Sequence, residues 1–349
     1  FFKQKTAYEI PKRDWSSDVC SSDLNRLHGF DARLAQLDSD PQLDPLDLGS
    51  PMVATARMNK RMTTAEVVAQ LRDGMTLGIG GWATRRKPMA LVREILRSPL
   101  RDLTVVSYGG PDVGMLLAAG KLRKLIFGFV TLDVLPLDMH FRNARQAGAF
   151  EVMELDEGMV QLGLRAAAMR VPFLPTHVGL GTDVLARNPS LRLVRSPYDD
   201  GTTLVAMPAL RLDAALLHVT ESDEKGNCVI ESPDPFFDDL MARAADRTYI
   251  SCERIAPTAK IGTHQRVRYQ PFERSLVTGV VEVPFGAHPT AGVPGYGIDV
   301  EHLKDYNAAT TAEAWAEYRR RFVDLATHDD YVAAVGGRGR IAAIAPPVY

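Results

Sequence analysis

A run of glycines and cations follows the first clear strand pattern of this chain. Its members are Gly80, Gly81, Arg85, Arg86 and Lys87. Bare backbone N–H groups, positive side chains and a helix N-terminus all attract anions. Proline fits the first turn of a helix, so Pro88 is expected to open the amphipathic helix over residues 89–97. The arrangement predicts a site for a phosphate or a carboxylate; a strand-to-helix turn with surface cations is the alternative.

This run matches neither of the two common phosphate-binding motifs. The P-loop pattern of Gly-x4-Gly-Lys-Ser/Thr is absent. A dinucleotide fingerprint would need a third glycine, but cations stand at its place after Gly78, Gly80 and Gly81. The residues therefore indicate an anion site without naming the anion.

A second glycine loop follows the next expected strand, over residues 103–107. It consists of Tyr108, Gly109 and Gly110, followed by proline and aspartate. Backbone N–H groups in such a loop can face the oxygen of a thioester and form an oxyanion hole. A tight turn that only ends the strand is the alternative.

These loops need a scaffold, and strand and helix patterns alternate along the chain. Strands are expected over residues 76–79, 103–107, 124–129, 150–154, 203–207, 213–219, 228–230 and 248–252. Helices are expected over 63–72, 89–97, part of 109–119, 139–148, 157–169 and 234–246, the last with Asp234 as its cap. The alternation predicts an α/β fold with an open, mostly parallel sheet and helices on both faces. Ligands bind such sheets at the carboxyl ends of the strands, where both glycine loops fall.

Composition sets limits on the class of protein. A net charge of −2, with 24% charged and 46% hydrophobic residues, is typical of a globular protein and argues against a nucleic-acid binder. No apolar run of membrane-spanning length occurs, so no membrane partner is expected. Cys228 and Cys252 have neither metal-ligand nor disulfide spacing, which favours a reducing, cytoplasmic location and no metal.

The first 57 residues do not continue this pattern. Residues 1–24 resemble translated sequencing-adapter sequence, and residues 37–51 are rich in Asp, Pro and Ser. We interpret residues 1–57 as a spurious or disordered leader, residues 58–310 as the main domain and residues 311–349 as a C-terminal helical tail. A real N-terminal extension is the alternative.

Four segments together carry a resemblance to a known family. Residues 78–88, 103–112, 166–175 and 213–219 resemble the alpha subunits of class I coenzyme A transferases. Within that family the chain is similar to the glutaconate CoA-transferase branch, and most of all to the alpha subunits of hydrolases that cleave steroid rings in CoA thioesters. The resemblance covers roughly residues 60–310.

The resemblance implies an enzyme, a partner and a substrate class. It implies a separate beta subunit, in a heterodimer or heterotetramer, which would carry the nucleophilic glutamate of CoA transfer to an acid. Coenzyme A would be part of the substrate, with no permanently bound cofactor. The phosphates or the acyl carboxylate would meet Arg85, Arg86 and Lys87.

In the hydrolase branch a glutamate of the alpha subunit serves the hydrolytic step, and Glu157 matches it. A carboxylate near an apolar pocket can act as a general base on water. Alternatively, Asp156 and Glu157 only begin a helix. Ring-cleaving hydrolysis is thus an alternative to transfer, and a non-catalytic ligand sensor is a second. We expect His218 to be a core residue and Glu253 to pair with Arg254; a place for Glu253 in the lining of the site is the alternative.

Overall fold

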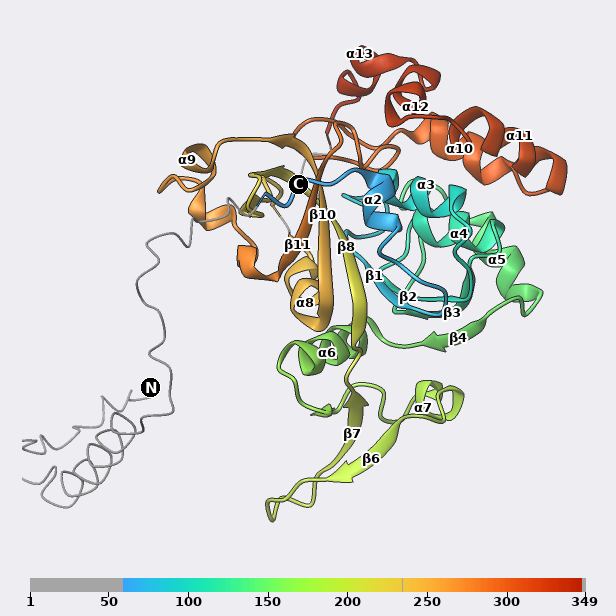
Figure 1. The fold of residues 1–349 in the computed structure, drawn as a ribbon. Helices are drawn as coiled ribbons and strands as arrows, with labels where there is room; N and C mark the ends of the chain where they lie inside the picture. Colours follow the sequence, from blue (N-terminus) through green and yellow to red (C-terminus); the bar gives the residue numbers. More distant parts are fainter. Residues whose placement is uncertain (1–58, 234, 347–349) are drawn as a thin grey trace, which may run out of the picture. The chain divides into compact units, whose positions relative to one another are not determined.

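A mainly parallel sheet lies at the centre of residues 59–233 and 235–346, the part of the chain that this computed structural model describes (Figure 1). The strand order is β11-β10-β8-β1-β2-β3-β4, with β9 antiparallel on β8. The strands are β1 (Thr76–Ile79), β2 (Leu103–Ser107), β3 (Leu122–Phe127), β4 (Glu151–Glu154), β8 (Leu212–Ser222), β9 (Cys228–Val229), β10 (Ala245–Ile255) and β11 (Val277–Glu282). The predicted α/β fold is confirmed.

Helices cover both faces of this sheet. One face carries α2 (Thr64–Val68), α3 (Met89–Arg97), α4 (Pro111–Ala118) and α5 (Met139–Gln146), and the other carries α6 (Glu157–Ala168) and α8 (Asp238–Ala244) (Figure 1). Strand side chains alternate between the two cores, as the period of a strand requires. On β8, for example, Leu216 packs into the first core and Leu217 into the second.

Two helices differ from the predicted bounds by more than two residues at one end. The helix expected over residues 63–72 is only α2, which Thr63 caps in a capping box with Glu66. The helix expected from residue 234 begins at Asp238, and Asp234 itself lies outside the described residues. The prediction of that start was wrong because Phe236 adopts a left-handed φ of 57°, which a helix cannot include.

A second, antiparallel sheet was not predicted. Its order is β5-β7-β6, formed by β5 (Phe173–Thr176), β7 (Thr203–Pro208) and β6 (Arg192–Arg195), with α7 (Asp183–Arg187) between β5 and β6. The strands β5 and β6 are short and mostly exposed, so they lack an apolar alternation. Pro175 also argues against a strand, although it is tolerated here because β5 is an edge strand.

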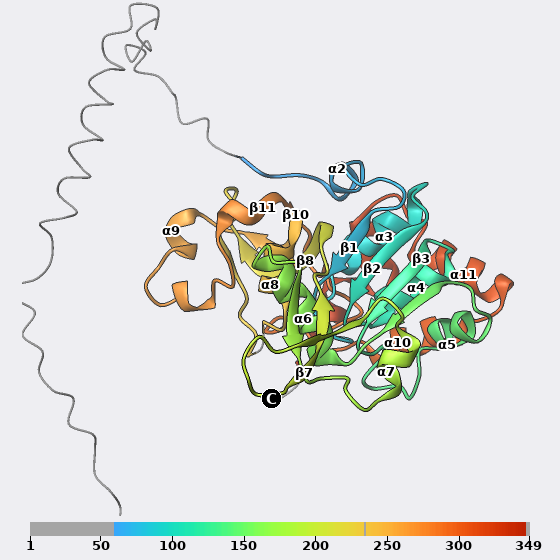
Figure 2. The same cartoon turned by 90° about the horizontal axis from the view of Figure 1, so that it is seen from below.

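The end of the described chain is helical and shares the first core. It comprises α10 (Val300–Ala308), α11 (Ala312–Phe322), α12 (His328–Ala334) and α13 (Gly337–Ala342). Short helical segments α9 (Thr258–Ile261), η1 (Val267–Tyr269) and η2 (Arg274–Leu276) precede β11. Tyr318, Phe322 and Tyr331 are buried in the core that α3 and α4 also line. Helix α10 contacts both α5 and α11 (Figure 2).

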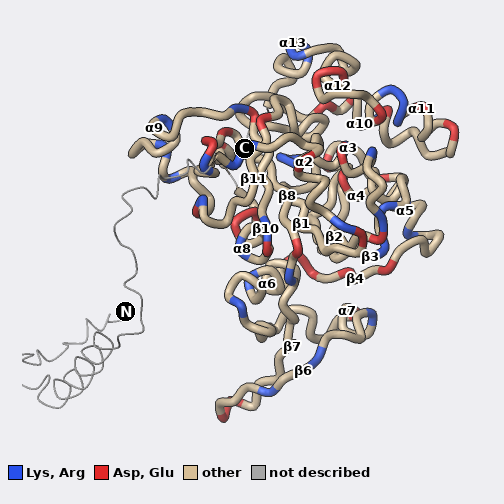
Figure 3. The backbone as a smooth tube through the Cα atoms, viewed as in Figure 1, with Lys and Arg blue, Asp and Glu red and all other residues tan. Residues whose placement is uncertain are grey.

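Charged residues of both signs are interspersed along the described chain (Figure 3). None of the helices in residues 59–233 and 235–346 is both long and apolar enough to cross a bilayer. The leader interpreted over residues 1–57 lies outside the described residues.

Candidate active site

Glu157 lies at the carboxyl edge of the sheet, where β4 ends and α6 begins. The preceding residue, Asp156, caps α6 by accepting a hydrogen bond from Gly158 N at 2.7 Å. Partial burial raises the pKa of Glu157 above its usual value, and the negative charge of Asp156 raises it further. A carboxylate with a raised pKa binds a proton more readily, which suits a base that takes a proton from water.

A pocket of about 630 Å³ opens beside this carboxylate. It is lined by Gly128, Phe129, Arg145, Glu154, Leu155, Asp156, Glu157, Asp183, Val184 and Arg187. Its volume lies within the range of small-molecule sites, about 300–1,000 Å³. The lining residues follow the ends of β3 and β4 or belong to α5 and α7, so both the main sheet and the unpredicted segment shape it.

Aromatic rings form a continuous cluster next to the pocket. We call this cluster the aromatic wall; its members are Trp82, Tyr108, Phe129, Phe236 and Phe237. Trp82 stacks on Tyr108 with ring centroids 5.1 Å apart and planes inclined by 13°. Phe129 lies 4.8 Å from Trp82 and also lines the pocket of Glu157. The Tyr108 hydroxyl donates a hydrogen bond to the Glu157 carbonyl oxygen at 3.2 Å, which joins the wall to the site.

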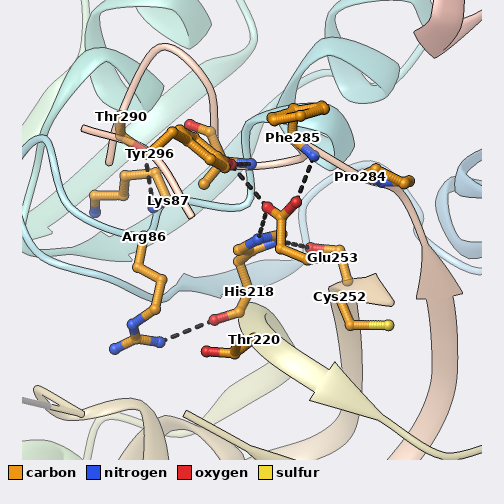
Figure 4. A network of polar contacts seen from close by, with 12 residues as sticks. Arg86, Lys87, His218, Thr220, Cys252, Glu253, Pro284, Phe285, Thr290 and Tyr296 are labelled. Atoms are coloured by element: carbon orange, nitrogen blue, oxygen red, sulfur yellow. Dashed lines mark hydrogen bonds and ion pairs between the residues drawn. The ribbon is translucent and has the colours of Figure 1, made fainter. Parts of the chain in front are cut away.

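The predicted anion ligand Arg86 is instead part of the interior. Its side chain is 3% exposed and its Nη1 lies 2.6 Å from Asp238 Oδ2. The same guanidinium donates to the carbonyl oxygen of His218 at 2.9 Å (Figure 4). It also donates to the carbonyl oxygen of Pro235 at 2.9 Å. Since its charge is neutralised and buried, we correct the expectation that Arg86 meets a substrate phosphate.

Lys87 is likewise buried rather than presented to a ligand. Its Nζ donates to Ser107 Oγ at 2.8 Å and lies 3.3 Å from Asp112 Oδ2, and neither charged side chain is exposed. Burial lowers the pKa of Lys87, and Asp112 counteracts this effect. The third predicted cation, Arg85, is one-third exposed, with its Nε 4.0 Å from Asp133 Oδ2. Of the three cations, Arg85 alone has a side chain that reaches the surface of the described chain.

The N–H groups of both glycine loops are already occupied within the protein. Gly80 N donates to Leu216 O at 2.9 Å and Gly109 N to Phe129 O at 3.1 Å. The other two glycines donate to the carboxylates that pair with the buried cations: Gly81 N to Asp238 Oδ1 at 2.9 Å, and Gly110 N to Asp112 Oδ1 at 2.8 Å. We therefore correct the prediction that these four N–H groups bind a phosphate or form an oxyanion hole.

The glycines are needed for close packing of the loops. A Cβ on Gly110 would lie 1.8 Å from the carbonyl oxygen of Ala83, which no side chain can tolerate. Gly81 has a φ of +73°, and a Cβ there would lie 2.5 Å from Arg85 O. Ala83 N in turn donates to Tyr108 O at 3.1 Å. The loops after β1 and β2 are thus held against each other, which brings Trp82 over Tyr108.

Comparison with known proteins identifies the family. The model described as coenzyme A transferase matches residues 61–271. The chain belongs to the coenzyme A transferase family. The "Cholesterol ring-cleaving hydrolase IpdA subunit" of Rhodococcus jostii is 47% identical over 287 residues, covering 80% of this chain and 97% of that protein. One of the subunits of glutaconate CoA-transferase from Acidaminococcus fermentans is 28% identical, covering 80% of this chain and 92% of the relative.

Solved structures also share the fold of this chain. Glutaconate coenzyme A-transferase from Acidaminococcus fermentans matches with a TM-score of 0.76 at 27% identity, covering 82% of this chain and 95% of that one. The AibA/AibB decarboxylase matches with a TM-score of 0.67 at 30% identity, covering 74% and 96%. Transfer, ring hydrolysis and decarboxylation thus occur on related chains, so the fold alone does not select the reaction. This CoA-transferase-family chain is an enzyme subunit.

Glu253 holds a polar network at the end of β10 (Figure 4). Its carboxylate accepts a hydrogen bond from the Tyr296 hydroxyl at 2.8 Å and from Phe285 N at 2.5 Å, and lies 2.9 Å from His218 Nε2. Burial by itself would raise the pKa of Glu253, but these partners, His218 foremost among them, lower it below its usual value. The predicted pairing of Glu253 with Arg254 was wrong, because Arg254 pairs with Glu221.

His218 is a satisfied core residue, as predicted. Its side chain is 1% exposed, and its Nδ1 lies 2.9 Å from the Oγ of Ser251. That hydroxyl donates to Leu217 O at 3.1 Å, so it accepts a hydrogen bond from Nδ1–H rather than donating one to this nitrogen. Among residues 59–233 and 235–346, no group of three or more His, Cys, Asp or Glu side chains is placed to hold a metal ion.

The sequence contained a signal for the aromatic wall that its interpretation did not use. Trp82, Tyr108 and Phe129 each come within three residues of the end of a neighbouring parallel strand, β1, β2 or β3. Because such ends meet at one edge of the sheet, aromatic residues there are expected to lie together. Phe236 and Phe237 join them from the segment before α8, which no local pattern connects to the loops.

Proposed function

We propose that this chain is the alpha subunit of a two-subunit enzyme that hydrolyses a carbon–carbon bond in the ring of an acyl-CoA thioester, with Glu157 as the base that activates water. The observation that carries the proposal is the position of Glu157: it lines a pocket of about 630 Å³, where partial desolvation and the neighbouring Asp156 raise its pKa. The 47% identity to a cholesterol ring-cleaving hydrolase subunit supports hydrolysis of a ring.

The proposed step balances with water as the only co-reactant. Glu157 takes a proton from water while the water oxygen attacks a ketone carbon of the ring. The carbon–carbon bond beside that ketone breaks, and the electron pair stays on the carbon that leaves. Glu157 returns its proton to that carbon, and the former ketone carbon becomes a carboxyl group that contains the water oxygen. The thioester stays intact, and coenzyme A acts as part of the substrate rather than as a permanent cofactor.

Transfer of CoA to a carboxylic acid is the second candidate, favoured by the likeness to glutaconate CoA-transferase. It would require a nucleophilic glutamate on the partner subunit. A non-catalytic sensor is not favoured, because the family and its named relatives are enzymes. In either reaction the site includes Tyr108 beside Glu157, and Arg85 is the cation accessible to a phosphate.

The proposed assembly contains a beta subunit, as a heterodimer or heterotetramer, and neither nucleic acid nor membrane. The relatives that support it are named as subunits of larger enzymes. We further propose that the enzyme works in the cytoplasm, since Cys228 and Cys252 are both free thiols.

The test is to co-express the chain with its beta subunit and to screen acyl-CoA esters with and without an acid acceptor. In ¹⁸O-labelled water, hydrolysis of the ring places the label in a new carboxyl group. Glu157→Gln should lower kcat by a factor of about 10² to 10⁴ and leave ester binding unchanged. Glu154→Gln is the matched control, because Glu154 lines the same pocket but is paired with Arg145.

Unchanged turnover in Glu157→Gln would remove Glu157 from the mechanism. Product formation only when an acid acceptor is present would show transfer instead of hydrolysis.

A further inference from the structure

The aromatic wall is an apolar surface that the described chain leaves partly uncovered. Trp82, Phe129, Phe236 and Phe237 are each half-buried, and Tyr108 is fully buried at their base. Trp82 contacts the other four rings, with centroid distances from 4.8 to 5.9 Å. A group of large apolar side chains with one uncovered side is typical of a binding surface.

The wall is continuous with the site of Glu157. Phe129 belongs to the wall and also lines the pocket that contains the carboxylate. Tyr108 bonds the Glu157 backbone through its hydroxyl. A ligand in the pocket therefore has the uncovered rings beside it, within reach of an acyl group that extends from the reacting carbon.

The wall is also held rigidly. Asp238 accepts the N–H of Gly81, the residue before Trp82, and is itself fixed by Arg86. Asp112 accepts the N–H of Gly110, two residues after Tyr108, and is fixed by Lys87. Two buried ion pairs thus fix the two loops that carry the stacked rings. Because the side chains of such a surface are already ordered before binding, little binding free energy is lost in ordering them.

We propose that the aromatic wall binds the acyl part of the substrate and selects ring-containing acyl groups over extended chains. The inference rests on the proposed function, because it assigns the residues that recognise the acyl group there. Flat rings offer a broad apolar face that can lie against the uncovered sides of the half-buried rings of the wall, whereas a flexible chain must lose rotational freedom to lie there.

The test uses the assembled two-subunit enzyme and a pair of CoA esters with the same number of acyl carbons, one fused-ring and one straight-chain. Both are measured as ligands by calorimetry, and the ring ester also as a substrate. Trp82→Leu should weaken binding of the ring ester by a factor of about ten to a hundred and binding of the straight-chain ester by less than about threefold. Trp82→Phe, which keeps a ring, should give a smaller loss.

Trp315 supplies a matched control elsewhere in the fold. It is half-buried and stacks on Tyr318 with centroids 5.6 Å apart and planes inclined by 11°, much as Trp82 stacks on Tyr108. Trp315→Leu should change binding of neither ester. If this substitution shifts both affinities as Trp82→Leu does, the effect is general loosening of the fold and the proposal is wrong.

If Trp82→Leu weakens binding of the ring ester and the straight-chain ester equally, the aromatic wall does not distinguish acyl groups by shape. If Trp82→Leu and Trp82→Phe both prevent assembly with the beta subunit, the wall is covered by that subunit and not by substrate. The proposed function fails on a different result, namely no turnover of any ring ester by the unaltered enzyme.

Discussion

Replacement of Arg86 by methionine tests whether this cation stabilises the fold or binds a ligand. Arg86 and Asp238 are 3% and 1% exposed, and their nearest atoms are 2.6 Å apart. Arg86→Met removes the cation and leaves the carboxylate buried without a counter-charge. Breaking a buried pair from one side costs about 3–5 kcal/mol of stability. We expect a loss of that size, because no other cation lies within ion-pair distance of Asp238 in the described chain.

A double variant isolates the charge from the other contacts. In Arg86→Met/Asp238→Asn the amide oxygen still accepts the N–H of Gly81, and no buried charge remains. What is lost is the donation by Arg86 to two carbonyl oxygens, worth about 1 kcal/mol each. The double variant should therefore be more stable than Arg86→Met by about 1–3 kcal/mol.

The assay is urea denaturation of the assembled enzyme at one fixed concentration, with KM for a CoA ester measured in parallel. Arg85→Met is the control, because Arg85 is one-third exposed and its Nε lies 4.0 Å from Asp133 Oδ2. That substitution should cost less than about 1 kcal/mol. The reasoning is refuted if Arg86→Met is as stable as Arg85→Met while its KM rises more, since Arg86 would then be a ligand contact.

Three further predictions concern the site and the loops. Since Asp156 raises the pKa of the neighbouring base and catalysis needs the deprotonated base, Asp156→Asn should move the acid limb of the kcat/KM profile to lower pH; a limb that stays in place would contradict this. Gly110→Ala should cost about 3 kcal/mol or more because its Cβ meets backbone at 1.8 Å, whereas Gly148→Ala, with open space and a φ of +62°, should cost about 1–2 kcal/mol, both by urea denaturation. Burial raises the pKa of Cys228 and Cys252, so peptide mapping after alkylation of the native enzyme should find both unmodified; rapid labelling would refute their burial.

Most of the parallel sheet was predictable because strands such as β2 and β8 are apolar runs with turn signals on either side, but the strand β11 was not predicted. β2 and β8 carry residues for a core on each face, and their near-continuous hydrophobicity is typical of strands covered on both sides. The antiparallel sheet was not predictable in this way. Its edge strand β6 reads Arg-Leu-Val-Arg and buries little, so tertiary pairing with β7 decides its conformation rather than its own pattern.

The sequence predicted part of the candidate site, but it does not show in which direction a side chain points. A sequence shows that Arg86 is a cation beside a glycine loop, but not that its side chain turns towards Asp238, 152 positions later in the chain. The same holds for Glu253, whose neighbour in sequence is Arg254 but whose partners are His218 and Tyr296. Adjacency along a strand places alternate side chains on opposite faces, so it is a poor guide to pairing.

The satisfied polar groups of the two loops determine what the site can bind. An anion site needs donors that are free to turn to the ligand, and the N–H groups of Gly81 and Gly110 are bound to carboxylates. Because these bonds also pull the loops together, they leave the rings of Trp82 and Tyr108 stacked beside Glu157. The residues that in sequence suggest a phosphate cradle thus assemble an apolar surface next to a carboxylate, which favours recognition of the acyl group at this end of the sheet over recognition of the nucleotide.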